Sequence, residues 1–149
     1  MYKRQIVHTT GNRQAHIILR GGTSGTNYDE GSIAKATSVL ERGGAPPKII
    51  VDCSHGNSLK DHKNQPKVAG VVGEQIANGN RNIKGVMLES YIHEGNQKLS
   101  PGKTRKEDLT YGVSVTDACI NLEDTAKVLQ QLSQSVQARR SRGDASSAV

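Results

Sequence analysis

The feature of this sequence that most restricts its fold is a set of three short aliphatic runs at regular spacing. They begin at residues 15, 48 and 84 and have the sequences AHIIL, KIIVD and KGVML. The runs are continuous rather than alternating, which is typical of strands buried on both faces of a parallel sheet. Their separation of roughly 35 residues is the size of one strand with its crossover helix. A shorter run at 113–115 (VSV) predicts a fourth strand.

Helical patterns fill the gaps between these runs. Apolar residues recur on one helical face over 32–42, 66–77 and 123–140. A glycine pair ends the first pattern, and Pro66 suits the first turn of the second. Because strands alternate with helices along the chain, the sequence predicts an α/β fold with a parallel sheet.

The two ends of the chain depart from this pattern. Residues 6–10 and 16–19, separated by a Gly-Asn pair, predict a β-hairpin. Residues 141–149 (SRGDASSAV) are small and polar and predict a disordered tail. Residues 1–5 (MYKRQ) fit no element and are interpreted as a scar of cloning or assembly. The organised part of the chain is therefore expected at 6–140.

Composition limits the size and the setting of this fold. The chain has 149 residues, whereas a complete (β/α)8 barrel typically has about 250. No apolar run approaches the length of a membrane span, and no N-terminal segment has the pattern of a signal peptide. Two cysteines are too few for a disulfide scaffold. We therefore expect a cytoplasmic protein in a reducing compartment, with no membrane partner.

The net charge of +6 favours anionic partners. The basic residues are scattered, and the densest group (Arg139, Arg140 and Arg142) suits the C-terminal end of a helix. Trp and Phe are absent, so aromatic platforms for single-stranded nucleic acid are not expected. Scattered positive charge fits a small phosphorylated substrate, and no nucleic-acid partner is predicted.

Charged side chains follow each of the aliphatic runs. Arg20 and two glycines come after the first run, His55 shortly after the second, Glu89 after the third and Asp117 after the fourth. Ligands of parallel α/β folds bind at the carboxyl ends of the strands, so these four residues are expected on one face. An arginine beside glycines suits a phosphate group, and a structural salt bridge is the alternative.

One imidazole and two carboxylates are a suitable donor set for Mn²⁺, Fe²⁺ or Zn²⁺, which makes His55, Glu89 and Asp117 candidate metal ligands. Each also has an ordinary explanation as a satisfied polar residue or, for Asp117, as a helix N-cap. Cys53 and Cys119 are interpreted as core residues, since free cysteines are commonly buried and inert.

A nucleophilic triad is a second interpretation of the same region. Ser54, His55 and Asp117 have the residue types of such a triad. The Gly-x-Ser-x-Gly elbow is absent, however, and adjacent Ser and His residues point in different directions. The metal-site interpretation is therefore preferred.

Five segments of the chain together resemble one known family. They are HIILRGG (16–22), TNYD (26–29), VDCSHGNS (51–58), GVMLESYIHEGNQ (85–97) and YGVSVTDACI (111–120). In sequence and order they are similar to class I 3-deoxy-7-phosphoheptulonate synthase (DAHP synthase), of the enterobacterial and fungal type. The resemblance runs from about residue 6 to residue 140 and covers the C-terminal part of the family's length.

The resemblance implies a fold, a reaction and a set of site residues. The fold is the C-terminal portion of a (β/α)8 barrel, with about three βα units after a β-hairpin. The reaction condenses phosphoenolpyruvate with erythrose 4-phosphate to 3-deoxy-D-arabino-heptulosonate 7-phosphate and phosphate, the first step of the shikimate pathway to aromatic amino acids. His55, Glu89 and Asp117 match the family's ligands of a divalent metal (Mn²⁺, Fe²⁺, Co²⁺ or Zn²⁺). Arg20 matches its contact to the phosphate of phosphoenolpyruvate.

The resemblance also implies inhibition by an aromatic amino acid and assembly as a homodimer or homotetramer. The family's first-strand metal cysteine and its Lys-Pro-Arg-Thr loop for erythrose 4-phosphate have no counterpart in this chain, so we expect the chain alone to be inactive. A self-associating half-barrel that binds metal and phosphate without this activity is the alternative. A basic nucleic-acid-binding module is a further one, against which the scatter of the cations argues.

Overall fold

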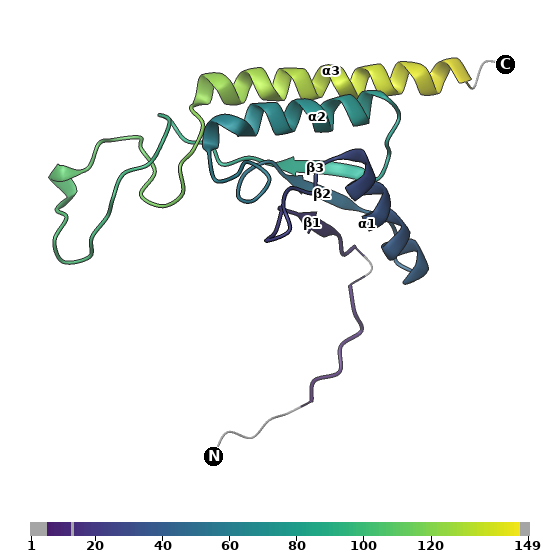
Figure 1. Cartoon of the computed structure of the whole chain (residues 1–149), viewed down its shortest axis with the longest axis horizontal. Coiled ribbons are helices and arrows are strands. Elements are labelled where there is room, and N and C mark those ends of the chain that lie inside the picture. The colour runs from purple at the N-terminus through teal and green to yellow at the C-terminus, as the bar shows by residue number, and fades with distance from the viewer. Residues whose placement is uncertain (1–5, 13, 147–149) are drawn as a thin grey trace.

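A computed structural model describes residues 6–12 and 14–146, with side chains described as far as Arg142. Within this part the elements follow the order β1, α1, β2, α2, β3, α3, with short 3-10 turns at His62–Asn64 (η1) and Lys106–Asp108 (η2) (Figure 1). The predicted alternation of strands and helices is confirmed. None of the described helices combines the length and the hydropathy that crossing a bilayer requires.

The strands form one parallel sheet in the order β1-β2-β3. They are β1 (Ile17–Leu19), β2 (Ile49–Asp52) and β3 (Ile83–Met87). β1 and β2 lie inside predicted runs, and β3 begins one residue before the run predicted at 84–88. β2 lies in the centre, and Ile49 and Val51 on it are fully buried. These two side chains point to the face of the sheet that the helices cover, whereas Ile50 between them points to the other face and is partly buried. Among the described residues, β1 and β3 each pair along one edge only.

Three helices follow the three strands. α1 spans Glu30–Arg42, α2 spans Gln65–Ala77 and α3 spans Leu122–Ser146. Asp29 caps the N-terminus of α1, where its side chain accepts a hydrogen bond from the Ser32 N–H, and α2 carries a proline in its first turn. These are the start signals expected of helices, and the observed starts lie within two residues of the predicted ones.

The core lies where the helices meet the sheet, and α2 is placed between the sheet and α3 (Figure 1). Its members are aliphatic side chains from β2, β3 and all three helices, which form two adjoining clusters. Burying one such side chain fully contributes about 1.5–3 kcal/mol. The clusters are Ile33, Ile49, Val51, Val72, Ile76 and Ile83, and beside them Cys53, Val68, Ala69 and Val128.

α2 and α3 run side by side in the same direction. Gly73 on α2 faces α3, where an added Cβ would lie 2.9 Å from the Ser135 hydroxyl. Further along, the Arg139 guanidinium donates to the Asn80 carbonyl at 3.0 Å. The parallel course of neighbouring helices follows from the parallel strands that precede them.

A long segment between β3 and α3 projects from the body of the molecule (Figure 1). Isolated bridges tie its two limbs together, pairing Ser90 with Ile120 and Gly95 with Cys119. These bridges return the chain to the edge of the sheet before α3 begins. The segment therefore brings residues near 117 back beside the end of β3.

Two predicted strand elements are absent from the described residues. Residues 6–10 form no strand, and β1 pairs only with β2 among the described residues, so the predicted hairpin is absent there. Ile6 and Val7 are largely exposed, because the short segment has no apolar face to bury. The predicted fourth strand at 113–115 is an irregular segment with one bridge, from Ser114 to Asn96.

The predicted disordered tail is also corrected. α3 continues through residue 146 instead of ending near 140, while residues 147–149 lie outside the described part, as do residues 1–5. Extending an existing helix fixes one residue for each hydrogen bond gained, and arginine and alanine are good helix formers. The earlier residues of α3 pack against α2, and the helix therefore continues into a segment whose sequence alone gives only a weak indication of helix.

Candidate metal centre

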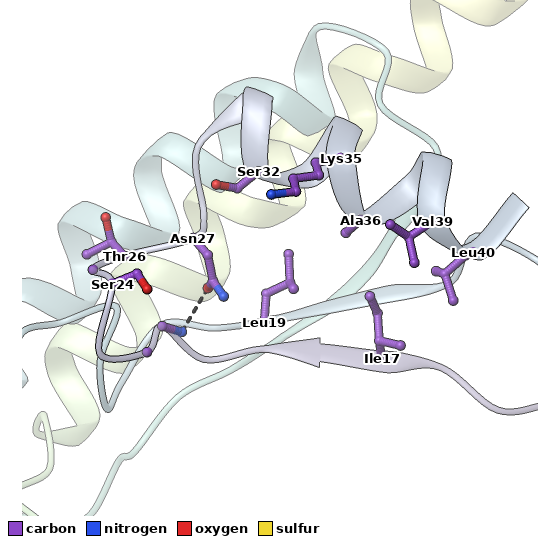
Figure 2. Close-up of a pocket in the computed structure, with 13 residues that line it drawn as sticks. Ile17, Leu19, Ser24, Thr26, Asn27, Ser32, Lys35, Ala36, Val39 and Leu40 are labelled. Carbon is purple, nitrogen blue, oxygen red and sulfur yellow. Dashed lines mark hydrogen bonds between the residues drawn. The ribbon is translucent and has the colours of Figure 1, made fainter. Parts of the chain in front are cut away.

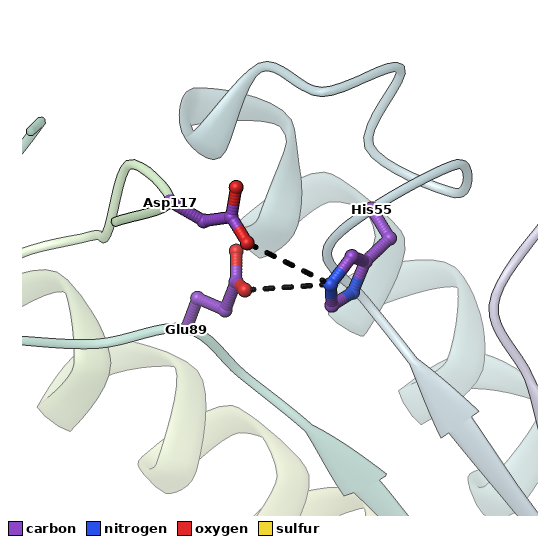
Figure 3. A group of neighbouring side chains, drawn as sticks. All are labelled: His55, Glu89 and Asp117. Carbon is purple, nitrogen blue, oxygen red and sulfur yellow. Dashed lines mark ion pairs between the residues drawn. The ribbon is translucent and has the colours of Figure 1, made fainter.

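The three predicted metal ligands meet at the carboxyl edge of the sheet. His55 follows β2, Glu89 follows β3, and Asp117 lies on the segment that returns toward α3. One donor atom from each lies within 4.8 Å of the others (Figure 3). The structure thus brings together three residues that are far apart in the sequence, and their donor types suit a divalent transition metal.

A buried carboxylate orients the imidazole of His55. Asp52 Oδ2 lies 2.8 Å from His55 Nδ1, and the Ser54 hydroxyl also lies 2.8 Å from this nitrogen. Asp52 is only 2% exposed. With Nδ1 engaged, Nε2 faces the two other residues, 3.6 Å from Glu89 Oε1 and 4.0 Å from Asp117 Oδ2. This is the arrangement in which an imidazole presents its lone pair to a metal.

The position of Glu89 is fixed through its backbone. The buried side chain of Gln65 donates to the Glu89 carbonyl at 3.0 Å and accepts from the Glu89 N–H at 2.8 Å. Both bonds hold the peptide groups of Glu89, and no ion pair with a lysine or arginine engages its carboxylate among the described residues. Gln65 therefore positions a potential ligand without competing for it.

The electrostatics of the cluster favour a cation. Desolvation raises the pKa of Glu89, the nearby Asp117 and Asp52 carboxylates raise it further, and His55 and Arg20 act in the opposite direction. Three carboxylates thus surround one imidazole, and a divalent ion would relieve their mutual repulsion. The Asp117 side chain is 72% exposed, so the cluster is open to solvent on one side.

A cavity of about 110 Å³ adjoins the cluster, and Ser58, Lys60 and His62 line it together with the three potential ligands. Lys60 belongs to the loop after β2, and this loop has unusual backbone geometry. His55, Leu59 and Lys60 have φ values of 50°, 56° and 60°, in the left-handed region that side chains disfavour. Such strain is commonly found at functional sites.

Arg20 lies at the end of β1, exposed at the same edge of the sheet. It is close enough to Glu89 to lower the pKa of that carboxyl, although it does not line the cavity. It makes no salt bridge within the described part of the chain, which is contrary to the structural alternative considered for it. Its guanidinium is therefore available to an anion beside the cluster.

The remaining candidates lie in the interior. Cys53 and Cys119 are buried, as predicted, and neither belongs to the cluster. Burial raises the pKa of the Cys53 thiol to about 12. Ser54 is 2% exposed and its hydroxyl lies 2.5 Å from Asp52, so it is not placed to attack a substrate. Asp117 does not cap a helix, because α3 begins at Leu122.

Sequence reasoning gave no role to two residues that shape this centre. Asp52 is the last residue of the second aliphatic run, and its position three residues before the histidine is a usable signal for its role. Gln65 gave no signal, because a glutamine at the start of a helix is ordinarily exposed. Its contact with Glu89 bridges 24 residues and arises only from the packing of α2.

The fold and the cluster together define a parallel α/β protein with a candidate divalent-metal centre at the strand ends. The model of the DAHP synthetase I family matches residues 2–130, and the chain belongs to this family. The resemblance seen in its motifs is thereby confirmed.

Named relatives agree with this assignment. A putative phospho-2-dehydro-3-deoxyheptonate aldolase of Schizosaccharomyces pombe is 55% identical over 139 residues, which is 91% of this chain and 36% of that protein. The Tyr-sensitive phospho-2-dehydro-3-deoxyheptonate aldolase of Escherichia coli is 46% identical over 87% of this chain and 35% of its own length. The chain thus spans little more than a third of these relatives.

A solved structure gives the same result at the level of the fold. The phospho-2-dehydro-3-deoxyheptonate aldolase from Francisella tularensis SCHU S4 superimposes with a TM-score of 0.80 and 42% sequence identity. The superposition covers 88% of this chain and 37% of that one. The arrangement of strands and helices described above is therefore shared with a member of the same family.

Proposed function

We propose that this chain supplies the C-terminal part of a (β/α)8-barrel DAHP synthase, with its share of the active site at the carboxyl ends of β1, β2 and β3. The observation that carries the proposal is the convergence of His55, Glu89 and Asp117 within 4.8 Å at those strand ends. Family membership and the aldolase names of the relatives support it. The reaction joins phosphoenolpyruvate to erythrose 4-phosphate and releases phosphate.

His55, Glu89 and Asp117 would hold the divalent metal, which is Mn²⁺, Fe²⁺, Co²⁺ or Zn²⁺ by the chemistry of the donors. When bound, the metal supplies Lewis-acid polarisation of the aldehyde oxygen of erythrose 4-phosphate. Asp52 holds the imidazole of His55 through Nδ1, and Gln65 holds the backbone of Glu89. These partners keep the donor atoms in place before any ligand arrives.

Arg20 would bind the phosphate of phosphoenolpyruvate beside this centre. Its guanidinium fork matches phosphate oxygens, and its exposure at the end of β1 leaves it accessible. An anchored phosphate places the nucleophilic carbon of phosphoenolpyruvate against the aldehyde. A carbon–carbon bond then forms, water adds to the former enol carbon, and phosphate leaves with cleavage of its bond to that carbon.

The partners and setting of the whole protein belong to the same proposal. Relatives are named tyrosine-inhibited in Schizosaccharomyces pombe and phenylalanine-inhibited in Saccharomyces cerevisiae. We infer that the whole protein binds an aromatic amino acid inhibitor, assembles as a homodimer or homotetramer, and acts in the cytoplasm.

Three measurements test the proposal. The chain alone should bind one Mn²⁺ in an electron paramagnetic resonance titration, and His55→Ala should abolish this binding. The wild-type chain alone should show no turnover with phosphoenolpyruvate, erythrose 4-phosphate and Mn²⁺. A chimera that joins the N-terminal part of the 55%-identical Schizosaccharomyces pombe relative to this chain should then be active. Loss of that activity in Glu89→Gln is expected, and full activity in Glu89→Gln would contradict the metal role.

One observation favours a second candidate, a self-associating half-barrel without this activity. β1 and β3 each have an unpaired edge among the described residues, and Ile18 and Met87 on them are exposed. Unpaired edges favour association with other strands. A single discrete oligomer in sedimentation velocity, together with an inactive chimera, would support this candidate over the first.

A further inference from the structure

Two asparagines join the loop after β1 to the loop after β2. Asn57 is 2% exposed, and its side-chain nitrogen donates to the Leu19 carbonyl at 3.0 Å and to the Asp52 carbonyl at 2.8 Å. Its side-chain oxygen accepts from the Asn27 N–H at 2.8 Å. Each polar atom of this buried amide is therefore used in a contact between segments that are distant in the sequence.

Arg20 stands at the centre of these contacts. The Asn27 side-chain oxygen accepts from the Gly21 N–H at 2.8 Å, the bond drawn as a dashed line in Figure 2. The Asn57 N–H donates to the Arg20 carbonyl at 3.2 Å. Asn57 also bonds the Leu19 carbonyl. The asparagine pair therefore holds the backbone of three successive residues, Leu19, Arg20 and Gly21.

Asn57 also reaches the residues that support the metal centre. Asn57 bonds the carbonyl of Asp52, and the carboxylate of Asp52 orients His55. The backbones also touch directly, since a Cβ added to Gly21 would lie 2.6 Å from the carbonyl carbon of Gly56. One buried amide thus fixes both the strand end that carries Arg20 and the strand end that orients the imidazole.

We infer that Asn27 and Asn57 are positioning residues that set the place of the Arg20 guanidinium relative to the metal centre at His55. The inference rests on the proposed function, because it gives Arg20 the phosphate and His55 the metal. Neither asparagine belongs to the cluster of His55, Glu89 and Asp117. Their role is to keep the Arg20 guanidinium, which binds the phosphate, at a fixed distance from the His55 imidazole, which binds the metal.

The test compares Asn27→Ala with Asn27→Asp and with the control Asn82→Ala. Asn27→Ala removes the acceptor for the Gly21 N–H, whereas Asn27→Asp keeps an oxygen there. Asn82 also makes a side-chain hydrogen bond, to Thr37, but it precedes β3 at the opposite end of the sheet. Circular dichroism melting of each variant verifies that the fold is retained.

Three quantities are measured on the chain. Electron paramagnetic resonance gives the Mn²⁺ affinity, calorimetry gives the phosphoenolpyruvate affinity, and ³¹P relaxation by bound Mn²⁺ at saturating phosphoenolpyruvate reports the distance from metal to phosphorus. Asn27→Ala should leave the Mn²⁺ affinity unchanged, weaken phosphoenolpyruvate binding on the order of tenfold and change the relaxation rate. Asn27→Asp should restore the relaxation rate, while its added charge near Arg20 makes its affinity uninformative.

The outcomes separate this inference from the proposed function. A wild-type chain that binds no Mn²⁺, or binds Mn²⁺ but no phosphoenolpyruvate, overturns the roles of the site residues and the inference with them. A wild-type chain that binds both, with Asn27→Ala unchanged in affinity and relaxation, overturns the inference alone. Equal effects of Asn27→Ala and Asn82→Ala on relaxation would also overturn it, because a general loss of stability would then be the cause.

Discussion

At the scale of single residues, Asp52 determines which nitrogen of His55 is free. The carboxylate accepts from the Ser54 N–H and hydroxyl through one oxygen and engages His55 Nδ1 through the other. Because both of its oxygens are used, it cannot itself turn toward a metal. Its effect is to fix the tautomer and the orientation of the imidazole.

Asp52→Asn should therefore weaken Mn²⁺ binding by about 10–100-fold. The new amide can donate to Nδ1, which drives the imidazole proton to Nε2 and removes the lone pair from the metal side. Asp29→Asn is the matched control, since asparagine caps a helix as well as aspartate and Asp29 caps α1. Equal Mn²⁺ affinity of Asp52→Asn and the wild type in paramagnetic resonance titrations would contradict the role given to Asp52.

The buried thiol of Cys53 gives a prediction about alkaline pH. Burial raises its pKa from the ordinary 9.0 to about 12, so the unfolded chain loses this proton at a lower pH than the folded chain. The free energy of unfolding should therefore fall between pH 9 and 12, where the unfolded state binds fewer protons. Urea denaturation of Cys53→Ala should show a shallower fall over this range than the wild type. Parallel curves would mean that the thiol is not protected from ionisation.

At the scale of elements, the contact between the loops after β1 and β2 is a contact between backbones. Gly21 has a φ of 75°, and a Cβ there would lie 2.6 Å from Gly56 and 2.7 Å from the Asn57 nitrogen. Gly56 has the reciprocal restriction, because its own Cβ would lie 2.9 Å from the Arg20 carbonyl oxygen. The two strand ends can approach this closely only without side chains between them.

Gly21→Ala should lower the free energy of unfolding by roughly 2–5 kcal/mol, the sum of a left-handed backbone and an overpacked contact. Gly22→Ala is the control, since Gly22 has open space around the position of a Cβ. Urea denaturation followed by circular dichroism measures both. If the free energy of unfolding falls no more in Gly21→Ala than in Gly22→Ala, the two loops can move apart without a loss of stability.

The elements show where sequence patterns were sufficient and where they were not. The runs at 15–19, 48–52 and 84–88 predicted three strands correctly to within one residue, because short unbroken aliphatic runs are typical of the strands of parallel sheets. The expected burial on both faces is not observed, since Ile18 and Met87 are exposed. The run at 113–115 is shorter, has a serine between its two valines, and is tied into a long irregular segment by a single bridge. The hairpin at 6–10 failed because a turn signal does not supply a partner or an apolar face.

The candidate site was predictable in a different way. The types of His55, Glu89 and Asp117 and their places after apolar runs indicated a metal centre before any geometry was known. The convergence of His55 and Glu89 follows from the parallel order of β2 and β3, whereas the irregular segment after β3 brings Asp117 to them in place of the predicted fourth strand. The supporting contacts did not, because Gln65 to Glu89 and Asn57 to Leu19 bridge residues that only the packed fold brings together.

At the scale of the whole molecule, the described helices leave one face of the sheet uncovered. Ile18 on β1 and Met87 on β3 are 46% and 41% exposed, and both strands keep an unpaired edge among the described residues. Exposed apolar groups beside an unpaired parallel strand are a site of association. In the barrel proposed above, this face and these edges would be covered by the remaining strands.

The double variant Ile18→Lys and Met87→Lys should reduce self-association of the chain. Added lysines repel a second copy at the sheet while leaving the buried clusters unchanged. Leu129→Lys, at an exposed position of α3, is the matched control and should leave self-association unaltered. Sedimentation velocity over a range of concentrations gives the comparison. A wild-type chain that is monomeric at every concentration would contradict the assignment of this face.

The left-handed residues of the loop after β2 have a consequence for the order of folding. His55, Leu59 and Lys60 gain nothing from their backbone angles until the hydrogen bonds of the loop are in place, such as the one from the Lys60 N–H to the His55 carbonyl. The loop should therefore take its native shape late and in one step, after β2 and α2 have packed. A chain stopped just before that step would have a complete core and no imidazole facing Glu89.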